Sequence, residues 1–452
     1  MRVIFAPWPA PAHLYPMIPL AWALQAAGHE VCIAAPPAIK DDIVAAGLTA
    51  VTLGPESAPV ARAAGMPRPP HIREQMDRLT ESLDLAPAER DPWDVFQRFM
   101  LPGIWNFHPA GVSPKEPNPV VDDFVEFARA WRPDLVLWDP GTPSGAVAAL
   151  ASGAAHARMM WGLDYFGWTI ERFAERRDRP ALAGVDDPMT EAVRPIAEKY
   201  GFEVDDEMLY GQWTVDPTPA GIRLPVAKGR TLSVRWVPYT GASAMPEWLH
   251  GRPERPRVGV SLGLSRRMYF RGGWTEIPKV MEMVSDLDIE VVATLNEEQI
   301  GGTPVPDNVR VVEYVPLTQL LPTCSAFIHH GGFGTFAAAS ALRTPQIILD
   351  SDEENGLVDI TIEEDGTEWS VVRKHPECSP TAAYVNAHNA GLGLHHKVLP
   401  VDTMRKQLLR VLEDPTFQNG ARGVYEDLQA TPSPAEIVPM LERLTAHYRR
   451  RG

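Results

Sequence analysis

Residues 327–346, FIHHGGFGTFAAASALRTPQ, restrict the possible folds of this chain more than any other segment. They contain a short apolar strand, a turn rich in glycine and a helix of small residues that stops near Pro345. A buried strand that runs through a glycine turn into a helix is typical of α/β proteins with parallel sheets. The segment therefore predicts that class of fold.

The turn in this segment also predicts a phosphate site. Glycine has no Cβ, so the amides around Gly332 and Gly334 can approach a ligand closely. Free N–H groups and the dipole at a helix N-terminus favour an anion, above all a phosphate. His330 adds a ring donor and Thr335 a hydroxyl. The alternative is a tight turn beside a core helix.

Length and composition limit the class of protein further. A chain of 452 residues predicts two or three domains, and its net charge of −16 disfavours nucleic acid and anionic membranes as partners. Three cysteines form no disulfide framework and suit a reducing cytosol. The N-terminus lacks a signal-peptide pattern, and no apolar run reaches membrane-spanning length. We therefore expect a cytoplasmic protein.

The chain begins as a strand, an apolar helix and a second strand. Residues 3–5 and 30–35 are the strands, and Gly28 ends the helix between them. In a parallel sheet, ligands bind beyond the carboxyl ends of the strands. His13 follows the first strand, and Asp139 ends a later apolar strand, so both side chains belong to that edge.

Two interpretations of this pair remain open. His13 could be a general base whose tautomer and basicity are set by Asp139. Alternatively, His13 caps the following helix and Asp139 is the N-cap of the helix near residues 141–152. The two roles of Asp139 are compatible with each other.

A second strand–helix series follows a polar segment at residues 247–257. We place an inter-domain linker at 239–256, between domains at 1–238 and 257–430. Strands are also expected at residues 214–223, 231–239, 258–262, 289–294, 309–315 and 346–349. Gly263 lies in a short turn after one of them, and an acidic run that contains Glu354 and Asn355 follows the last. This run is a solvated loop, or it binds ligand hydroxyls or a ligand amine.

Two further patterns each have two interpretations. Aromatic residues near 93–108 and 161–173 would suit a cleft for a large apolar ligand, or they simply pack in a core. His375 and Cys378 have a spacing that suggests zinc, but no second Cys-x-x-Cys is present. We therefore expect no metal.

The chain resembles, nearly end to end, the two-domain glycosyltransferases of antibiotic biosynthesis, which move deoxysugars from thymidine diphosphate (TDP) to macrolide or polyketide acceptors. The resemblance rests on the His13 loop with LAWALQAAGHEV, and on WRPDLVLWDP, GQWTVDPTPA, PEWLH, PDNVR, LLPTCSA, HHGGFGT and PSPAEIV. GQWTVDPTPA and PEWLH are most similar to the aminosugar subgroup, the desosaminyl-type transferases. The resemblance implies the GT-B fold, in which two Rossmann-like domains face each other across a cleft. It also implies a C-terminal helix, 431–452, that packs back on the first domain.

The same resemblance implies roles for individual residues. His13 matches the general base that deprotonates the acceptor hydroxyl, and Asp139 matches the carboxylate that orients it. Val315 matches the position that pairs with the nucleobase, and Glu354 and Asn355 match those that face the sugar. The residues that match the donor diphosphate site are His330, Gly332, Phe333, Gly334, Thr335 and the nearby Gly263.

One segment departs from the family pattern. After Asn355, about twenty-five extra residues at roughly 356–380 precede the next helix of the family. These residues lack a clear period, so we expect an inserted loop. Long loops at the edge of an active site are often lids.

The implied reaction is an inverting transfer of a deoxysugar from a TDP-sugar to a hydroxyl of a macrolide or polyketide aglycone. The sugar would be an aminodeoxysugar such as forosamine or desosamine. TDP-sugar is a co-substrate, and no other cofactor is expected. A cytochrome-like helper protein and a homodimer are candidate partners. The alternatives are a non-catalytic accessory protein and a UDP-sugar epimerase, both of the same fold.

Overall fold

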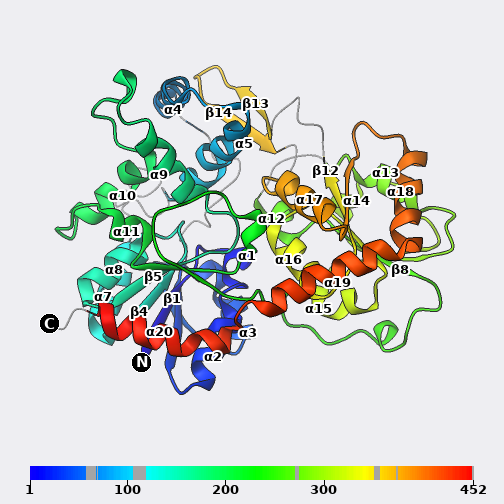
Figure 1. Cartoon of the computed structure of the whole chain (residues 1–452), viewed down its shortest axis with the longest axis horizontal. Coiled ribbons are helices and arrows are strands. Elements are labelled where there is room, and N and C mark those ends of the chain that lie inside the picture. The colour runs from blue at the N-terminus through cyan, green and yellow to red at the C-terminus, as the bar shows by residue number, and fades with distance from the viewer. Residues whose placement is uncertain are drawn as a thin grey trace.

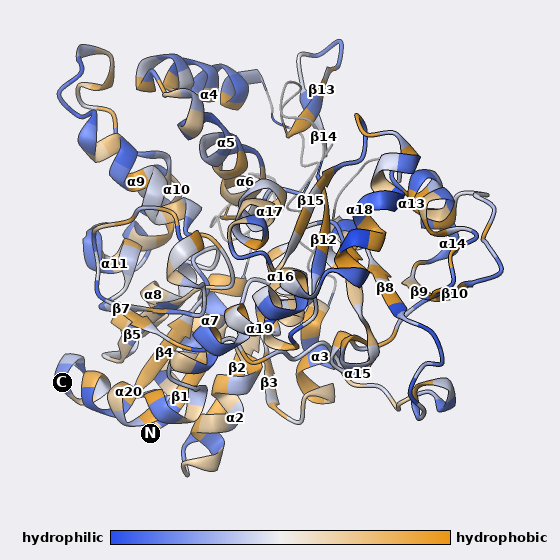
Figure 2. Ribbon diagram, turned by 45° about the vertical axis from the view of Figure 1, so that its right-hand side comes forward, coloured by the Kyte–Doolittle hydropathy of each residue, from blue (hydrophilic) through white to orange (hydrophobic). Residues whose placement is uncertain are grey.

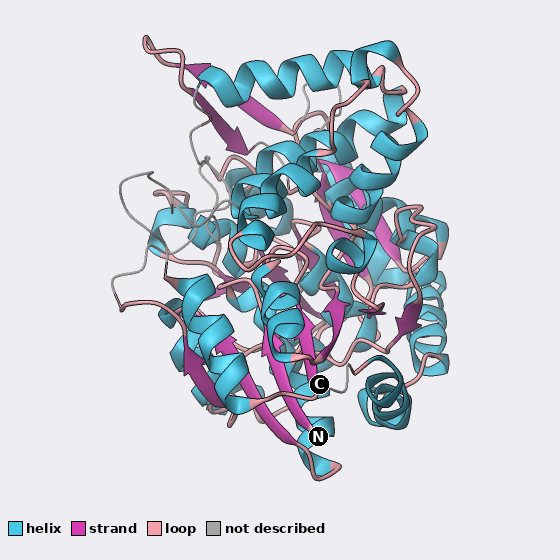
Figure 3. Ribbon diagram, turned by 90° about the vertical axis from the view of Figure 1, so that its left-hand side faces the viewer, coloured by secondary structure: helices cyan, strands magenta, loops and turns pink. Residues whose placement is uncertain are grey.

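Two parallel β-sheets, each flanked by helices, form the body of the protein in the computed structural model (Figure 1; Figure 3). The structure describes residues 1–56, 68, 70–104, 119–269, 274–350, 357–372 and 375–449. The first sheet has the strand order β3-β2-β1-β4-β5-β6-β7, and the second has the order β10-β9-β8-β11-β12-β15. Neighbouring strands are parallel in both sheets. Each sheet with its helices is a Rossmann-like unit.

The first unit contains seven of these strands. They are β1 (Arg2–Ala6), β2 (Glu30–Ala35), β3 (Thr49–Thr52), β4 (Leu135–Trp138), β5 (Ala155–Met159), β6 (Trp213–Asp216) and β7 (Thr231–Ser233). Its helices are α1 (Pro11–Leu14), α2 (Ile18–Ala26), α3 (Lys40–Ala45), α4 (Pro70–Leu83), α5 (Pro87–Val95), α6 (Leu101–Ile104), α7 (Val120–Trp131), α8 (Ser144–Ser152), α9 (Tyr165–Glu175), α10 (Pro188–Glu198) and α11 (Asp206–Tyr210). A π-helical turn, η2 (Phe96–Met100), joins α5 to α6.

The second unit and the C-terminal helices follow. The strands are β8 (Arg257–Ser261), β9 (Glu290–Thr294), β10 (Val309–Val312), β11 (Ala326–His329), β12 (Gln346–Asp350) and β15 (Gly391–His395). The helices are α12 (Leu264–Tyr269), α13 (Ile277–Val284), α14 (Glu297–Ile300), α15 (Leu317–Leu320), α16 (Phe333–Ala341), α17 (Cys378–Ala387), α18 (Val401–Glu413), α19 (Pro415–Ala430) and α20 (Pro434–Tyr448). In the part of the chain that the structure describes, no helix is both long and apolar enough to cross a membrane.

Continuous apolar runs explain the central strands of both sheets. All residues of β4, β8 and β12 are buried, as expected for parallel strands that are covered on both faces. Figure 2 shows these sheets mainly in the hydrophobic colour, with hydrophilic residues on the outer helices. The bounds predicted for the second strand, 30–35, are confirmed. Gly28 ends the preceding helix with φ +86°, in the left-handed region that glycine adopts readily.

Two predicted strands of the first unit were too long. The strand expected at 214–223 ends at Asp216, and the one expected at 231–239 ends at Ser233. Pro217 and Pro219 follow the first of these ends, and proline has no N–H to donate to a neighbouring strand. These prolines explain why β6 ends at Asp216.

The predicted loop at 356–380 is wrong for its described part. β13 (Val358–Ile362) and β14 (Glu368–Val372) form an antiparallel hairpin, and Cys378 already begins α17. The turn contains Gly366 at φ +83°, preceded by Asp365. Asp-Gly is a strong hairpin signal, so this local sequence could have revealed the hairpin.

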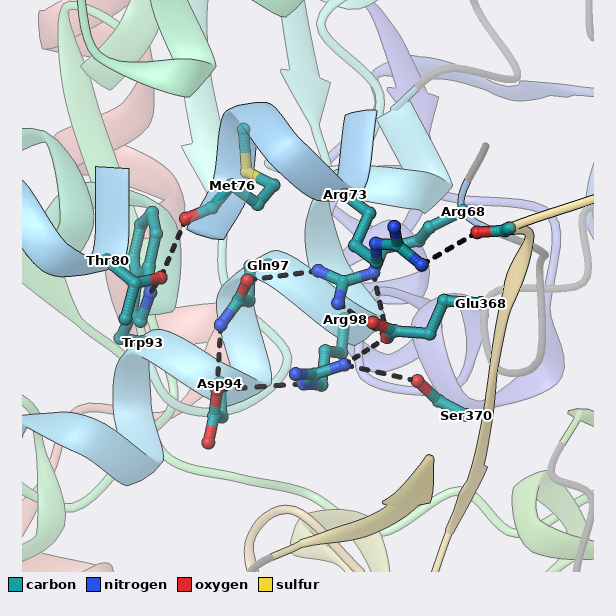
Figure 4. Close-up of polar contacts among 11 residues, drawn as sticks. Arg68, Arg73, Met76, Thr80, Trp93, Asp94, Gln97, Arg98, Glu368 and Ser370 are labelled. Atoms are coloured by element: carbon teal, nitrogen blue, oxygen red, sulfur yellow. Dashed lines mark hydrogen bonds and ion pairs between the residues drawn. The ribbon is translucent and has the colours of Figure 1, made fainter. Parts of the chain in front are cut away.

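The hairpin packs against the first unit (Figure 4). Glu368 Oε1 accepts hydrogen bonds from Arg68 Nε at 3.0 Å and from Arg98 Nη1 at 2.5 Å. The Glu368 and Arg68 side chains are only 4% and 3% exposed. Arg68 also forms an isolated antiparallel bridge with Glu368 through the backbone. A buried ion-pair cluster thus connects the segment before α17 with the first unit.

The last helix returns to the first unit. Ser433 Oγ accepts from the Glu436 amide, and Glu436 Oε2 accepts from the Ser433 amide at 2.7 Å, so a capping box begins this helix. Ile437 and Leu441 of α20 are buried in the core cluster that contains Leu24 of α2. Figure 1 shows α19 leading from the second unit into α20 beneath the first.

Candidate active site

One cleft of about 1680 Å³, its open mouth included, lies between the two units. The loop after β1 and the aromatic segments of the first unit form one wall. The loop after β8, the glycine turn after β11 and residues 375–377 form the other. His13 and the glycine turn therefore face the same space, at the carboxyl ends of the strands where open α/β sheets bind ligands.

His13 and Asp139 form a direct pair on the first wall. His13 lies in α1, and Asp139 follows β4, the neighbour of β1 in the sheet. His13 Nδ1 donates to Asp139 Oδ2 over 2.7 Å, and Asp139 Oδ1 accepts from the Gly141 amide at 2.7 Å. Asp139 is fully buried, whereas the His13 side chain is 17% exposed. Asp139 thus holds the ring in the tautomer that leaves Nε2 free to accept a proton.

The helix-capping interpretations find no support in these contacts. The N-cap of α2 is Met17, and no side chain caps that helix. The N-cap of α8 is Pro143, so Asp139 binds the loop amide of Gly141 rather than the helix N-terminus. The pairing of His13 with Asp139 is what the structure shows.

Aromatic rings surround the exposed part of His13. The ring centroids of Trp161 and Trp8 lie 4.2 Å and 5.0 Å from that of His13. Other large side chains that line the cleft are Phe99, Met100, Phe166, Trp236 and Tyr239. These walls can bind a large apolar molecule beside the imidazole.

The glycine turn opens α16 as expected, but its amides are not all free. Gly332 is the N-cap, and no side chain caps the helix. The Phe333 amide donates to Glu377 Oε2 at 2.8 Å, and the Thr335 amide donates to the Gly332 carbonyl at 3.1 Å. Among the described residues, the exposed amide of Gly334 has no hydrogen-bond partner. An anion at this turn can therefore bind an amide such as that of Gly334, but it must compete with existing hydrogen bonds for the amides of Phe333 and Thr335.

His330 packs directly over two glycines. A Cβ on Gly263 would lie 2.3 Å from His330 Cε1, and a Cβ on Gly332 would lie 2.5 Å from His330 Nε2. Any side chain at either position would collide with the ring, and Gly263 also has φ +75°. Burial lowers the pKa of His330 well below its ordinary value, and His375 lowers it further. The ring is therefore neutral near pH 7.

Of the remaining predicted residues, Val315 and Thr335 line the cleft. Val315 lines the cleft and is buried beside Leu249 and Leu320. β10 ends at Val312, so Val315 lies in the following loop rather than in the expected strand. The two predicted sugar contacts, Glu354 and Asn355, lie outside the described residues. Thr335 lines the cleft beside Gly334.

Glu377 is a residue of the site that sequence reasoning missed. It is 3% exposed and lies between the two units, because a Cβ on Gly162 would be only 2.4 Å from Glu377 Oε1. Burial raises the pKa of Glu377 to about 7, against the effect of the nearby Phe333 and Leu163 amides. The sequence contains no signal for this contact, since it depends on how the hairpin segment returns to α16.

Glu377 should make stability depend on pH. A pKa raised from about 4.5 to about 7 corresponds to up to about 3 kcal/mol of unfolding free energy. This contribution is complete below the unfolded pKa and is lost as the pH rises through 7. We expect urea unfolding of Glu377→Gln to show a smaller stability loss between pH 5 and pH 8 than the native protein. Glu413→Gln, at an exposed carboxylate, should keep the native difference; equal pH dependence in all three would contradict the prediction.

No metal-binding cluster is evident. Within the described ranges, no group of three or more His, Cys, Asp or Glu side chains is placed to hold a metal ion. Cys378, the proposed zinc partner of His375, is buried and donates from Sγ to the Leu349 carbonyl at 3.3 Å.

The arrangement defines a class of enzyme. Two Rossmann-like units face one cleft, with a histidine–aspartate base on one wall and a glycine turn at a helix N-terminus on the other. This is a glycosyltransferase of the GT-B fold, as the resemblance implied. The chain belongs to the erythromycin biosynthesis protein CIII-like family: the model of the N-terminal domain matches residues 22–263, and that of the C-terminal domain matches residues 278–374.

Characterised relatives match over the whole chain. The aclacinomycin-T 2-deoxy-L-fucose transferase of Streptomyces galilaeus is 38% identical over 468 residues, covering 100% of this chain and 97% of its own. The 10-deoxymethynolide desosaminyltransferase of Streptomyces venezuelae is 38% identical over 456 residues, which cover 100% of this chain and 98% of that transferase. Equal identity to transferases named for different sugars does not indicate which sugar this chain uses.

Solved structures match in the same way. The spinosyn forosaminyltransferase SpnP has a TM-score of 0.75 and 34% identity, with 99% of both chains covered. The glycosyltransferase VinC, solved in complex with DTDP, has a TM-score of 0.76 and 30% identity, with 99% of this chain and 100% of VinC covered. The GT-B fold is thereby confirmed.

Proposed function

We propose that this enzyme transfers a deoxysugar from a TDP-sugar to a hydroxyl of a macrolide or polyketide aglycone, with inversion at the anomeric carbon. The observation that carries the proposal is the placement of the His13–Asp139 pair and the α16 N-terminus on opposite walls of one cleft. The relatives and the complex of VinC with DTDP support the choice of donor.

The chemistry follows from the two walls. His13 Nε2 takes the proton of the acceptor hydroxyl while its oxygen attacks the anomeric carbon, and Asp139 stabilises the resulting imidazolium. The bond from that carbon to the diphosphate oxygen breaks, and the bonding electrons leave with TDP. The Gly334 amide, the Thr335 hydroxyl and the neutral His330 ring meet the charge that develops on the leaving group. With these groups in place, we propose that no metal ion or other cofactor is needed.

The sugar and the acceptor are proposed more narrowly. We favour an aminodeoxysugar such as forosamine or desosamine, as in the named functions of SpnP and the desosaminyltransferase. Aromatic walls around His13 suit an apolar aglycone. A cytochrome-like helper protein, a homodimer and a cytoplasmic location remain predictions.

A non-catalytic accessory role is the alternative that one observation favours. Glu377 occupies the Phe333 amide, which weakens the anion site unless its carboxylate is protonated or displaced. A UDP-sugar epimerase of the same fold is less consistent with the apolar wall around His13.

One set of assays tests the proposal. We expect calorimetry to detect TDP binding, and we expect TDP-aminosugars with a panel of macrolactone and polyketide aglycones to give glycosylated products. Neutral TDP-deoxysugars and a helper protein, present or absent, form the further arms. TDP binding without transfer in any arm favours the accessory role. Conversion of a UDP-sugar without acceptor identifies an epimerase.

A further inference from the structure

His375 reaches the donor wall from the segment that follows the β13–β14 hairpin. It lies after β14 and before α17, yet it lines the cleft beside His330 and Gly332. The ring centroids of His375 and His330 are 4.8 Å apart, at an interplanar angle of 70°.

A backbone contact determines which nitrogen of His375 carries hydrogen. The Glu377 amide donates to His375 Nδ1 at 3.3 Å, so Nδ1 accepts and the neutral ring carries its hydrogen on Nε2. The point that a Cβ on Gly332 would occupy lies 3.2 Å from His375 Nε2 and 2.5 Å from His330 Nε2. The two Nε2 atoms therefore converge over the glycine that opens α16.

The surroundings of the two rings keep both imidazoles neutral. Burial lowers the pKa of His375 to about 3, and Arg266 and His329 lower it further. The ring is thus a neutral N–H donor at pH 7. Arg266 is a buried cation that also acts on His330, and it is paired with Glu276. A diphosphate here would meet neutral imidazoles, with the Arg266–Glu276 ion pair nearby.

We propose that His375 is a second imidazole donor to the diphosphate of the nucleotide sugar, next to His330. The inference rests on the proposed function, and it places a binding residue in the segment where the chain departs from its family's pattern. The zinc interpretation of His375 loses its partner, because Cys378 is directed to the Leu349 carbonyl.

Three substitutions separate the two ring nitrogens. His375→Gln keeps an N–H near the Nε2 position, His375→Asn keeps an acceptor near Nδ1 but has no group that reaches the Nε2 position, and His375→Ala removes both. A hydrogen bond to a charged group is stronger than one between neutral groups, so we expect His375→Ala and His375→Asn to raise the Kd for TDP by about 10- to 100-fold. His375→Gln should recover most of this loss. The control is His388→Ala, an exposed histidine at the end of α17.

Calorimetric titrations with TDP and with thymidine give the readout. Thymidine carries no phosphate, so its Kd should change less than twofold in all variants. If the native protein binds TDP and His375→Ala binds it with the same affinity, this inference is overturned but the proposed function is not. An equal loss for thymidine and TDP would make His375 a structural residue and also overturn it. Absence of TDP binding to the native protein would instead overturn the proposed function.

Discussion

His13→Ala is expected to reduce kcat by about 10³-fold while the Kd for TDP stays within twofold. A general base contributes roughly 10²–10⁴ in rate, and His13 is paired with the buried Asp139 in the orientation that this role requires. The nucleotide site lies on the opposite wall, so its affinity should not change. Steady-state transfer assays with calorimetry of TDP binding provide the measurement.

Two further variants control this result. His71→Ala, at an exposed histidine of α4, should retain native kcat. Asp139→Asn should lose activity, but less than His13→Ala, because the imidazole remains while its orientation and tautomer are weakened. Near-native turnover of His13→Ala would refute its assignment as base. Loss of folding in Asp139→Asn would show that Asp139 is needed mainly for structure.

The second large effect concerns the ion-pair cluster of the hairpin. Glu368→Gln should cost about 3–5 kcal/mol of hairpin docking, because it leaves the buried guanidinium of Arg68 and that of Arg98 without their shared carboxylate (Figure 4). Both arginines belong to the first unit, so the loss falls on the contact between the hairpin and that unit. Hydrogen exchange of the β13 and β14 amides should become roughly 2 × 10²- to 5 × 10³-fold faster.

The matched control lies on the same hairpin. Glu363 is exposed at its turn, and Glu363→Gln should leave exchange unchanged. Exchange in Glu368→Gln at the native rate would mean that the cluster contributes little to docking. If docking also positions His375, the Kd for TDP should rise in Glu368→Gln and not in Glu363→Gln.

The local sequence was sufficient to predict many of the strands and part of the candidate site. Apolar runs bounded by glycine and proline predicted the central strands, since a buried parallel strand needs apolar residues on both faces. The carboxyl ends of parallel strands share one edge of a sheet, and this rule predicts that His13 and Asp139 lie at that edge. The pairing of β1 with β4 in the structure makes them neighbours. The HHGGFGT turn predicted the start of α16, because its glycines and amides act locally.

Only the tertiary structure decided the contacts between distant segments. Glu377 caps the Phe333 amide, His375 points to Gly332, and Glu368 joins the hairpin to Arg68. The spacing of these residues in the sequence does not predict any of these contacts, because each contact depends on where the chain returns after the hairpin. Periodicity and turn chemistry act over a few residues and so determine elements and their edges. Side chains from segments far apart in sequence acquire a role here only when packing of the two units brings them to one cleft.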